Sequence, residues 1–233
     1  MSISFVIPTL NEEGNVTRVF KLINETVGKT PIEWEVLFVD DKSTDNTQSE
    51  IKELPSDIAK LIISPERRGL GSALSLGWKE AKYEFVLFLD CDTGISVSDL
   101  KLLISSRCPK SVVIGSRYLK ESAIHGAPKL KVFLSKILNR IAGFITQIDA
   151  ADLSHSLRIF PNDFTDSLEI STHPGYFWVQ GTHFKKNGYD FLEVPITFNE
   201  RNVGLTKNQT RKMVSSVLET LPIIIRKRFN EYR

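Results

Sequence analysis

Apolar residues along the chain alternate between short continuous runs, typical of β-strands, and longer segments with the spacing of one helical face. Strands are predicted at residues 3–7, 34–39, 59–63 and 85–89. Helices are predicted at residues 12–27, 44–54 and 70–81. The strand runs are almost entirely apolar, as expected where both faces of a sheet are covered. This alternation predicts an α/β fold with a mostly parallel sheet between helices.

Three of the predicted strands are followed, within a few residues, by carboxylates that are candidates for one site. Glu12 comes after the first strand, Asp40 and Asp41 after the second, and Asp90 and Asp92 after the fourth. A single aspartate at such a place is more often a helix cap than a ligand. Ligands of open parallel sheets, however, bind beyond the carboxyl ends of the strands. Three acidic strand ends at one edge therefore predict a binding site.

The spacing of these carboxylates suggests what the site binds. Asp90 and Asp92 would share one face if the strand geometry continued past Leu89, and two oxygen ligands suit Mg²⁺ or Mn²⁺. Such a cation takes its other ligands from water and from substrate phosphates. Asp40 and Asp41 precede polar side chains suited to ribose hydroxyls or a base edge, at Ser43, Asp45 and Thr47. Together these residues predict a nucleoside diphosphate site.

Composition and charge exclude several other classes of protein. The 233 residues allow one large α/β domain with an appendage, and 41% hydrophobic with 25% charged residues is typical of a globular protein. A net charge of +2 argues against nucleic acid as the main partner. No apolar stretch approaches the roughly 20 residues that span a bilayer, and no secretory signal is recognisable. Cys91 and Cys108 match neither a disulfide framework nor a zinc site, so we expect a cytoplasmic protein.

Six segments, in this order, carry a resemblance to a known family: PTLNEEGN, VDDKSTDNT, RRGLGSALSLGW, FLDCDTG, VIGSRY and EVPITFNERNVGLTK. Together they resemble the family 2 glycosyltransferases of the GT-A fold, and among these the dolichyl-phosphate mannose synthase and polyprenyl-phosphate glycosyltransferase group. The resemblance covers about residues 3–210. It implies a GT-A domain with a Rossmann-like, mostly parallel sheet at residues 1–209, followed by a C-terminal basic amphipathic helix at 210–233.

The resemblance also implies roles for individual positions. Those expected to hold the donor are Pro8, Leu10, Glu12, Asp40, Asp41, Asp90, Cys91, Asp92, Arg117, Arg201 and Lys207. Of these, Asp90 and Asp92 match the metal and diphosphate pair. Cys91, between them, is also interpreted as a small buried apolar residue. Those expected to act in catalysis are Asp92, Arg117, Arg201 and Lys207.

The activity implied is transfer of a sugar, with inversion, from GDP-mannose or a UDP-hexose to a polyprenyl phosphate, with Mg²⁺ or Mn²⁺ as cofactor. A lipid phosphate is already anionic and needs no strong base, whereas a hydroxyl acceptor would need one, for which Asp149 and Asp152 are the candidates. Two alternatives stay open: a transferase to such a hydroxyl acceptor, and a non-catalytic nucleotide-sugar-binding subunit. The second is allowed by two departures from the motifs, Gly94 and the segment DLSHSLR.

Two segments, at residues 129–145 and 210–233, are basic and amphipathic. Such helices pack on a domain or on a second subunit, or lie on an anionic membrane where a polyprenyl phosphate would be found. Peripheral contact with the cytoplasmic membrane face is therefore one hypothesis and a homo-oligomer another. The four histidines show no metal-ligand spacing and are interpreted as surface or hydrogen-bonded residues.

Overall fold

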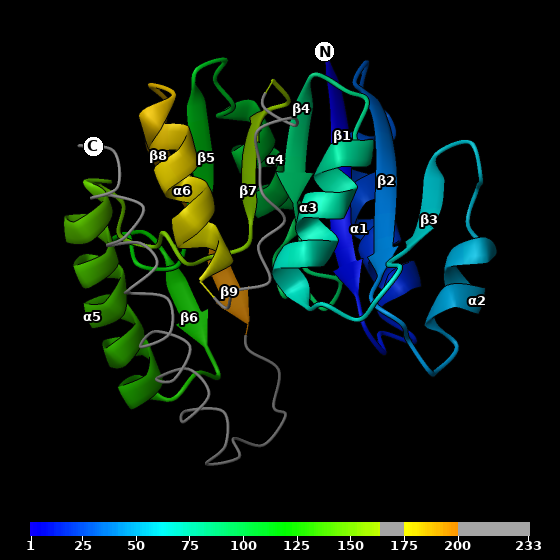
Figure 1. The fold of residues 1–233 in the computed structure, drawn as a ribbon, viewed down its shortest axis with the longest axis horizontal. Helices are drawn as coiled ribbons and strands as arrows, with labels where there is room; N and C mark the ends of the chain where they lie inside the picture. The colour runs from blue at the N-terminus through cyan, green and yellow to red at the C-terminus, as the bar shows by residue number, and fades with distance from the viewer. Residues whose placement is uncertain (164–174, 200–233) are drawn as a thin grey trace.

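A seven-stranded sheet runs through the centre of the protein, which the computed structural model describes at residues 1–163 and 175–199 (Figure 1). The strand order is β3-β2-β1-β4-β7-β5-β8, and only β7 runs antiparallel to its neighbours. The strands are β1 (Ser2–Thr9), β2 (Glu33–Asp40), β3 (Ala59–Ile63), β4 (Phe85–Phe88), β5 (Ser111–Ser116), β7 (Arg158–Pro161) and β8 (Asp190–Pro195). All the parallel strands therefore end at one edge.

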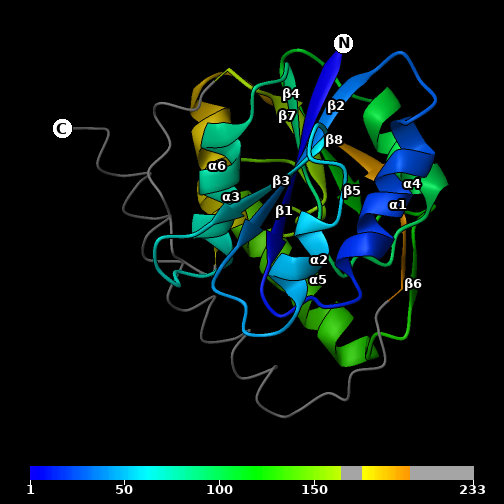
Figure 2. The same ribbon diagram turned by 90° about the vertical axis from the view of Figure 1, so that its right-hand side faces the viewer.

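Helices cover both faces of this sheet (Figures 1 and 2). One face is covered by α1 (Val16–Val27) and α4 (Val97–Ser105), and the other by α3 (Leu70–Glu80) and α6 (Tyr176–Lys186). A short helix, α2 (Thr47–Lys52), follows β2. The remaining elements are α5 (Lys129–Thr146) and a parallel pair of short strands, β6 (Ala123–His125) and β9 (Thr197–Asn199).

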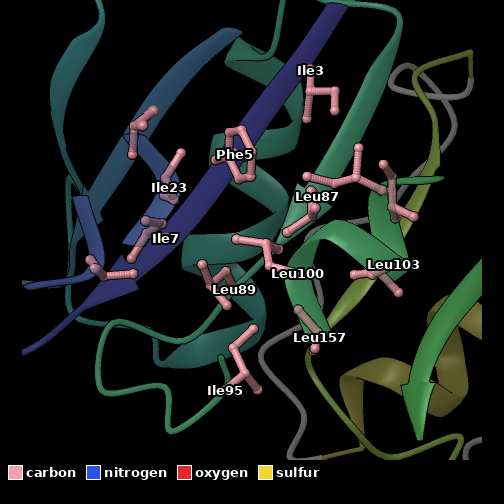
Figure 3. Packing of buried hydrophobic residues seen from close by; sticks show 14 of the residues in the cluster. Ile3, Phe5, Ile7, Ile23, Leu87, Leu89, Ile95, Leu100, Leu103 and Leu157 are labelled. Atoms are coloured by element: carbon pink, nitrogen blue, oxygen red, sulfur yellow. The ribbon is translucent and has the colours of Figure 1, made fainter. Parts of the chain in front are cut away.

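The two faces form two apolar clusters. Between the sheet, α1 and α4, aliphatic side chains such as Ile7, Ile23 and Leu100 are fully buried (Figure 3). The cluster under α3 and α6 is aromatic, and Trp78 lies at its centre with ring centroids 4.7 Å from Phe160 and 5.6 Å from Phe184. Burial of this much apolar surface is the main source of stability, at about 25 cal/mol per Å². It also fixes the strand ends relative to one another.

The predicted α/β architecture is confirmed, with small differences at the ends of elements. The helix expected from residue 12 begins at Val16, because residues 12–15 form a turn in which the Asn15 amide donates to the Glu12 carbonyl. The helix expected at residues 44–54 is confined to α2. The strand expected at 85–89 ends at Phe88. The predicted helix at 210–233 lies outside the described residues, within which no helix has the length and hydropathy to cross a bilayer.

Candidate functional site

A cavity of about 210 Å³ lies at the carboxyl ends of β1, β2 and β4, beside the first turn of α3. Its lining residues are Pro8, Thr9, Leu10, Glu12, Asp41, Gly69, Leu70, Ala73, Asp90, Cys91 and Asp92. The sequence-based expectation that acidic strand ends converge at one edge is therefore confirmed for the loops after β1, β2 and β4. The first turn of α3 was not among the expected site residues.

Asp90 and Asp92 reach the cavity from a turn. Strand β4 ends at Phe88, and the Thr93 amide donates to the Asp90 carbonyl at 3.1 Å, which closes the turn. The expectation that extended geometry would place both carboxylates on one strand face was therefore wrong. Asp92 is exposed, whereas the carboxylate of Asp90 lies deeper and accepts a hydrogen bond from the hydroxyl of Ser156.

The carboxylates of this cavity repel one another. Burial raises the pKa of Asp90, and the nearby Asp92 adds to this effect, while the Ser156 hydroxyl opposes it. Burial also raises the pKa of Glu12; a hydrogen bond from Asn15 opposes this, whereas the charges of Asp92 and Asp90 reinforce it. A cation between these groups would relieve the repulsion.

The donor set fits a hard divalent cation. Asp90 and Asp92 offer carboxylate oxygens, which Mg²⁺ and Mn²⁺ prefer. Within residues 1–163 and 175–199, however, no three side chains of His, Cys, Asp or Glu converge closely enough to enclose a metal. Such a site would leave most coordination positions to water and to phosphate oxygens of a ligand, as is usual for Mg²⁺ bound by one or two carboxylates.

The neighbouring pair Asp40 and Asp41 is arranged differently. Asp41 lines the cavity, but its carboxylate accepts hydrogen bonds from the backbone amides of Arg68, at 3.1 Å, and Gly69, at 2.8 Å. Asp40 is fully buried and does not line this cavity. Its carboxylate accepts from the Ser43 amide and hydroxyl and from Gln48 Nε2. These bonds give Asp40 a part in holding the loop after β2, and its expected contact with a nucleoside stays a prediction.

The polar side chains after Asp41 join two loops to each other. Ser43, Asp45 and Thr47 accept hydrogen bonds from the backbone amides of residues 11–13, at 2.9, 3.2 and 2.8 Å. These bonds give them a structural role, and the predicted contact with ribose hydroxyls or a base edge stays a prediction. By holding the loop after β1, they fix the positions of Leu10 and Glu12 in the cavity wall.

Arg117 forms the shortest ion pair of the described residues. Its Nε and Nη2 donate to the two oxygens of Asp152 at 2.7 and 2.8 Å, and its backbone amide adds a third bond at 3.0 Å. This pairing holds the pKa of Asp152 below its ordinary value despite complete burial. The charge of Arg117 also acts on Asp90. Arg117 is not among the residues that line the cavity, so it acts on the site through its charge.

The segment from Asp152 to Arg158 connects several parts of the site. Arg158 is fully buried and donates to the carbonyls of Leu153 and His155, and burial lowers its pKa to about 9. His155 Nδ1 contacts the Gly115 carbonyl at 2.7 Å, and burial lowers its pKa to about 4, so it is neutral at pH 7. This confirms the expectation of a hydrogen-bonded histidine.

Gly94 has a steric reason of its own. A Cβ atom there would lie 2.3 Å from the backbone oxygen of Asn199, whose side-chain amide donates to the Gly94 carbonyl at 3.0 Å. Gly94, one of the two departures from the family motifs, is thus required for β9 to pack on the loop of Asp90 and Asp92.

The remaining expected residues fall into three groups. Pro8 and Leu10 line the cavity with apolar surface. Cys91 also lines it and is otherwise buried in the apolar cluster, which confirms its interpretation as a small buried apolar residue, and burial and nearby carboxylates raise the pKa of its thiol. Arg201 and Lys207 lie outside the described residues. Ser156 was not expected, and no local pattern pointed to it.

Comparison with known proteins identifies relatives over most of the chain. Residues 4–168 match the model of the family described as glycosyl transferase family 2. Polyprenol monophosphomannose synthase of Mycolicibacterium smegmatis is 26% identical over 213 residues, which cover 87% of this chain and 79% of that protein. Dolichol-phosphate mannosyltransferase of Pyrococcus furiosus is 29% identical over 214 residues, which cover 89% of this chain but only 59% of that protein.

Solved structures share the fold. Glucosyl-3-phosphoglycerate synthase of Mycobacterium tuberculosis, solved with Mn²⁺, UDP and phosphoglyceric acid, superposes with a TM-score of 0.70 at 20% identity and covers 96% of this chain and 78% of that one. Mannosyl-3-phosphoglycerate synthase of Rubrobacter xylanophilus gives 0.69 at 14% identity, covering 98% and 75%. The expected GT-A fold is thereby confirmed. With the family match over residues 4–168, this chain belongs to glycosyl transferase family 2.

Proposed function

We propose that this glycosyltransferase moves a sugar, with inversion, from a nucleoside diphosphate sugar to a polyprenyl phosphate, and that it needs a divalent cation to do so. The observation that carries the proposal is the cavity at the sheet edge, where two carboxylates of one turn, Asp90 and Asp92, line the wall and form no ion pair with any side chain of residues 1–163 and 175–199. The two relatives named as mannosyl transferases to lipid phosphates support the choice of acceptor.

The wall of the cavity suits a nucleoside diphosphate. Pro8, Leu10 and Leu70 offer apolar surface for a base, and Leu70 is 47% exposed. The carboxylates of Asp90 and Asp92 would hold Mg²⁺ or Mn²⁺, which when bound supplies positive charge to offset the charge of the departing diphosphate. Glu12 lies at the same wall and adds to the negative charge there. A diphosphate would therefore be repelled by the site unless the cation is bound.

Arg117 would serve the phosphate side of the reaction. Its Nε and Nη2 are committed to Asp152, whereas Nη1 has no hydrogen bond among the described residues. Its side chain is 20% exposed, and its charge already acts on Asp90. A guanidinium fixed in this way can donate to a phosphate oxygen without reorganisation. We also assign Arg201 and Lys207 to this role, on the resemblance alone.

The pairing of Asp152 disfavours a hydroxyl acceptor. A general base for a hydroxyl must take up a proton near neutral pH. Asp152 is fully buried and bonded to Arg117, and its pKa is lowered, so it is a poor proton acceptor. Asp149 is exposed and is not among the residues of the cavity. A lipid phosphate needs no such base.

One face of α5 supports contact with a membrane. Five of the ten large hydrophobic side chains that are exposed among the described residues lie on this helix, at Leu130, Phe133, Ile137, Ile141 and Phe144. Their spacing places them along one side, and Lys129, Lys136 and Arg140 on the same helix are also exposed. Apolar and cationic side chains on one helical face suit an anionic lipid surface.

Vesicle flotation tests this contact. Wild-type protein is expected to float with vesicles that contain anionic lipid and to stay behind with neutral ones. Phe133→Ser and Phe144→Ser together should abolish flotation, because these side chains are 60% and 83% exposed. Leu192→Ser, which removes a 44% exposed side chain from the edge strand β8, is the matched control and should float normally. If the Phe133→Ser and Phe144→Ser double variant floats as well as wild type and the control, α5 is excluded as the membrane contact.

Donor titration tests the transferase proposal. Purified protein is titrated with GDP-mannose, UDP-glucose and UDP-N-acetylglucosamine, with and without Mn²⁺, and is then mixed with a short polyprenyl phosphate to assay the glycolipid. We expect cation-dependent binding of one donor, followed by transfer. Asp92→Ala should lose both, whereas Asp57→Asn, at an exposed residue, should keep both. No binding of any donor would overturn the proposed site, and binding without transfer would leave a nucleotide-sugar-binding subunit.

A further inference from the structure

The hydroxyl of Ser156 donates a hydrogen bond to Oδ2 of Asp90, from a loop 66 residues away in the sequence. Ser156 is buried, with 7% of its surface exposed. Oδ2 of Asp90 is thereby occupied, whereas Oδ1 accepts no hydrogen bond among residues 1–163 and 175–199. One oxygen of the carboxylate is held by the protein, and the other is left for a ligand.

The loop that carries Ser156 is itself fixed at several points. On one side, Asn139 of α5 donates from Nδ2 to the Ser154 hydroxyl at 3.0 Å and accepts from the Ser154 amide at 2.9 Å. On the other, Arg158 of β7 holds the carbonyls of Leu153 and His155. Because residues 153–155 are held directly before Ser156 and strand β7 begins two residues after it, its hydroxyl has little freedom to follow Asp90.

Asp90, by contrast, belongs to a segment with few restraints of its own. It follows the end of β4 and lies in a turn rather than in the sheet ladder. A carboxylate in such a turn can rotate between rotamers, and groups outside the metal's own ligands usually fix the orientation of a ligand. A neutral hydroxyl does this without adding a positive charge that would compete with a cation.

We propose that Ser156 is a positioning residue for the cation site, whose hydroxyl holds Oδ2 of Asp90 so that Oδ1 faces a divalent cation. The inference rests on the proposed function, because it takes Asp90 as a ligand. It extends that function by assigning a role to a residue of the Asp152–Arg158 loop.

Titration with Mn²⁺ tests the role without any turnover. Free Mn²⁺ gives a six-line electron paramagnetic resonance signal that falls on binding, and the titration is run on the full chain with GDP and, separately, with UDP. Ser156→Ala should weaken Mn²⁺ binding roughly ten- to a hundredfold, the usual cost of losing a partner of a metal ligand. Ser156→Thr, which keeps the hydroxyl, should restore binding.

The matched control is Ser75→Ala. It removes a buried hydroxyl of α3 that contacts Tyr176 and not Asp90, and it should bind Mn²⁺ like wild type. The inference is overturned if Ser156→Ala binds Mn²⁺ normally, or if Thr and Ala at position 156 are equally impaired, which would make the packing of the loop responsible. The variant Asp90→Asn distinguishes failure of this inference from failure of the proposed function. If Asp90→Asn binds Mn²⁺ like wild type, Asp90 is not a cation ligand and the proposed cation site itself is wrong.

Discussion

At the end of β2 the carboxylates of Asp40 and Asp41 are saturated with hydrogen bonds from amides and side chains, whereas at the end of β4 Asp92 accepts none among the described residues. Both pairs follow buried apolar strands at the same edge of the same sheet. The difference teaches that an acidic strand end can hold loops in place or can be kept available for a ligand. The two kinds of strand end are distinguished by how many carboxylate oxygens already accept hydrogen bonds from the protein.

The largest effect is expected where a saturated carboxylate lies next to the site. Asp152→Ala would leave the largely buried Arg117 without its partner and should lower the free energy of unfolding by about 3–5 kcal/mol. Urea denaturation measures this loss. The double variant Arg117→Met with Asp152→Ala should recover part of it, since no charge is then left unpaired. A loss below about 1 kcal/mol would mean that the pair is not structural.

The open carboxylate should behave in the opposite way. Asp92→Asn is expected to lower kcat/KM by at least about a hundredfold, because a neutral amide would hold the divalent cation less well and the negative charge of the departing diphosphate would be less well offset. Its melting temperature should stay close to that of wild type, since Asp92 is exposed. Steady-state kinetics and a thermal melt of the same sample give both numbers. A variant that is active but unstable would reverse the comparison.

Acidification should destabilise the loop that carries Ser156. The pKa of His155 is lowered to about 4 in the folded chain, so between its unfolded value near 6.5 and about 4 the unfolded state binds more protons. Stability from this group is therefore present above the unfolded pKa and declines as the pH falls to about 4, by roughly 3 kcal/mol in total. Urea midpoints from pH 7 to 4.5 follow this decline.

His155→Gln is the control for that titration. Glutamine can still donate to the Gly115 carbonyl but takes up no proton in this range. The pH dependence of the variant should be shallower than that of wild type. Parallel curves would assign the acid sensitivity to other groups.

The smallest effect in the series concerns Asp40. Asp40→Asn keeps the size of the side chain but replaces one acceptor with a donor facing Ser43 or Gln48, at a cost of about 1–3 kcal/mol. The affinity of the folded Asp40→Asn protein for the nucleotide sugar should stay near that of wild type. If affinity falls while stability holds, Asp40 contacts the nucleoside after all and the two strand ends are alike.

Much of the site was predictable because its signal is local. Asp90, Asp92, Glu12 and Asp41 follow apolar runs directly, and the rule that parallel strands end at one edge brings them together. The rule places residues near the edge but does not say which way a side chain points. It therefore could not show that Asp40 turns into the protein while Asp41 lines the cavity.

The contacts that escaped prediction all join distant segments. Ser156 meets Asp90 across 66 residues, and Asn199 meets Gly94 across 105. A single sequence carries no trace of such pairs, since neither partner has unusual neighbours. The antiparallel strand β7 was unexpected for the same reason, because its place between β4 and β5 depends on the whole sheet.

The position of β7 sets an order for folding during synthesis. Strand β5 cannot join the first half of the sheet until β7, which lies between β4 and β5, has been made. Since 70 residues separate the end of β4 at Phe88 from Arg158, translation at about 5–20 residues per second leaves the apolar edge of β4 unpaired for roughly 4–14 seconds. Unpaired strand edges invite association with other chains. A nascent chain stalled within this interval should therefore be the form that aggregates or recruits a chaperone.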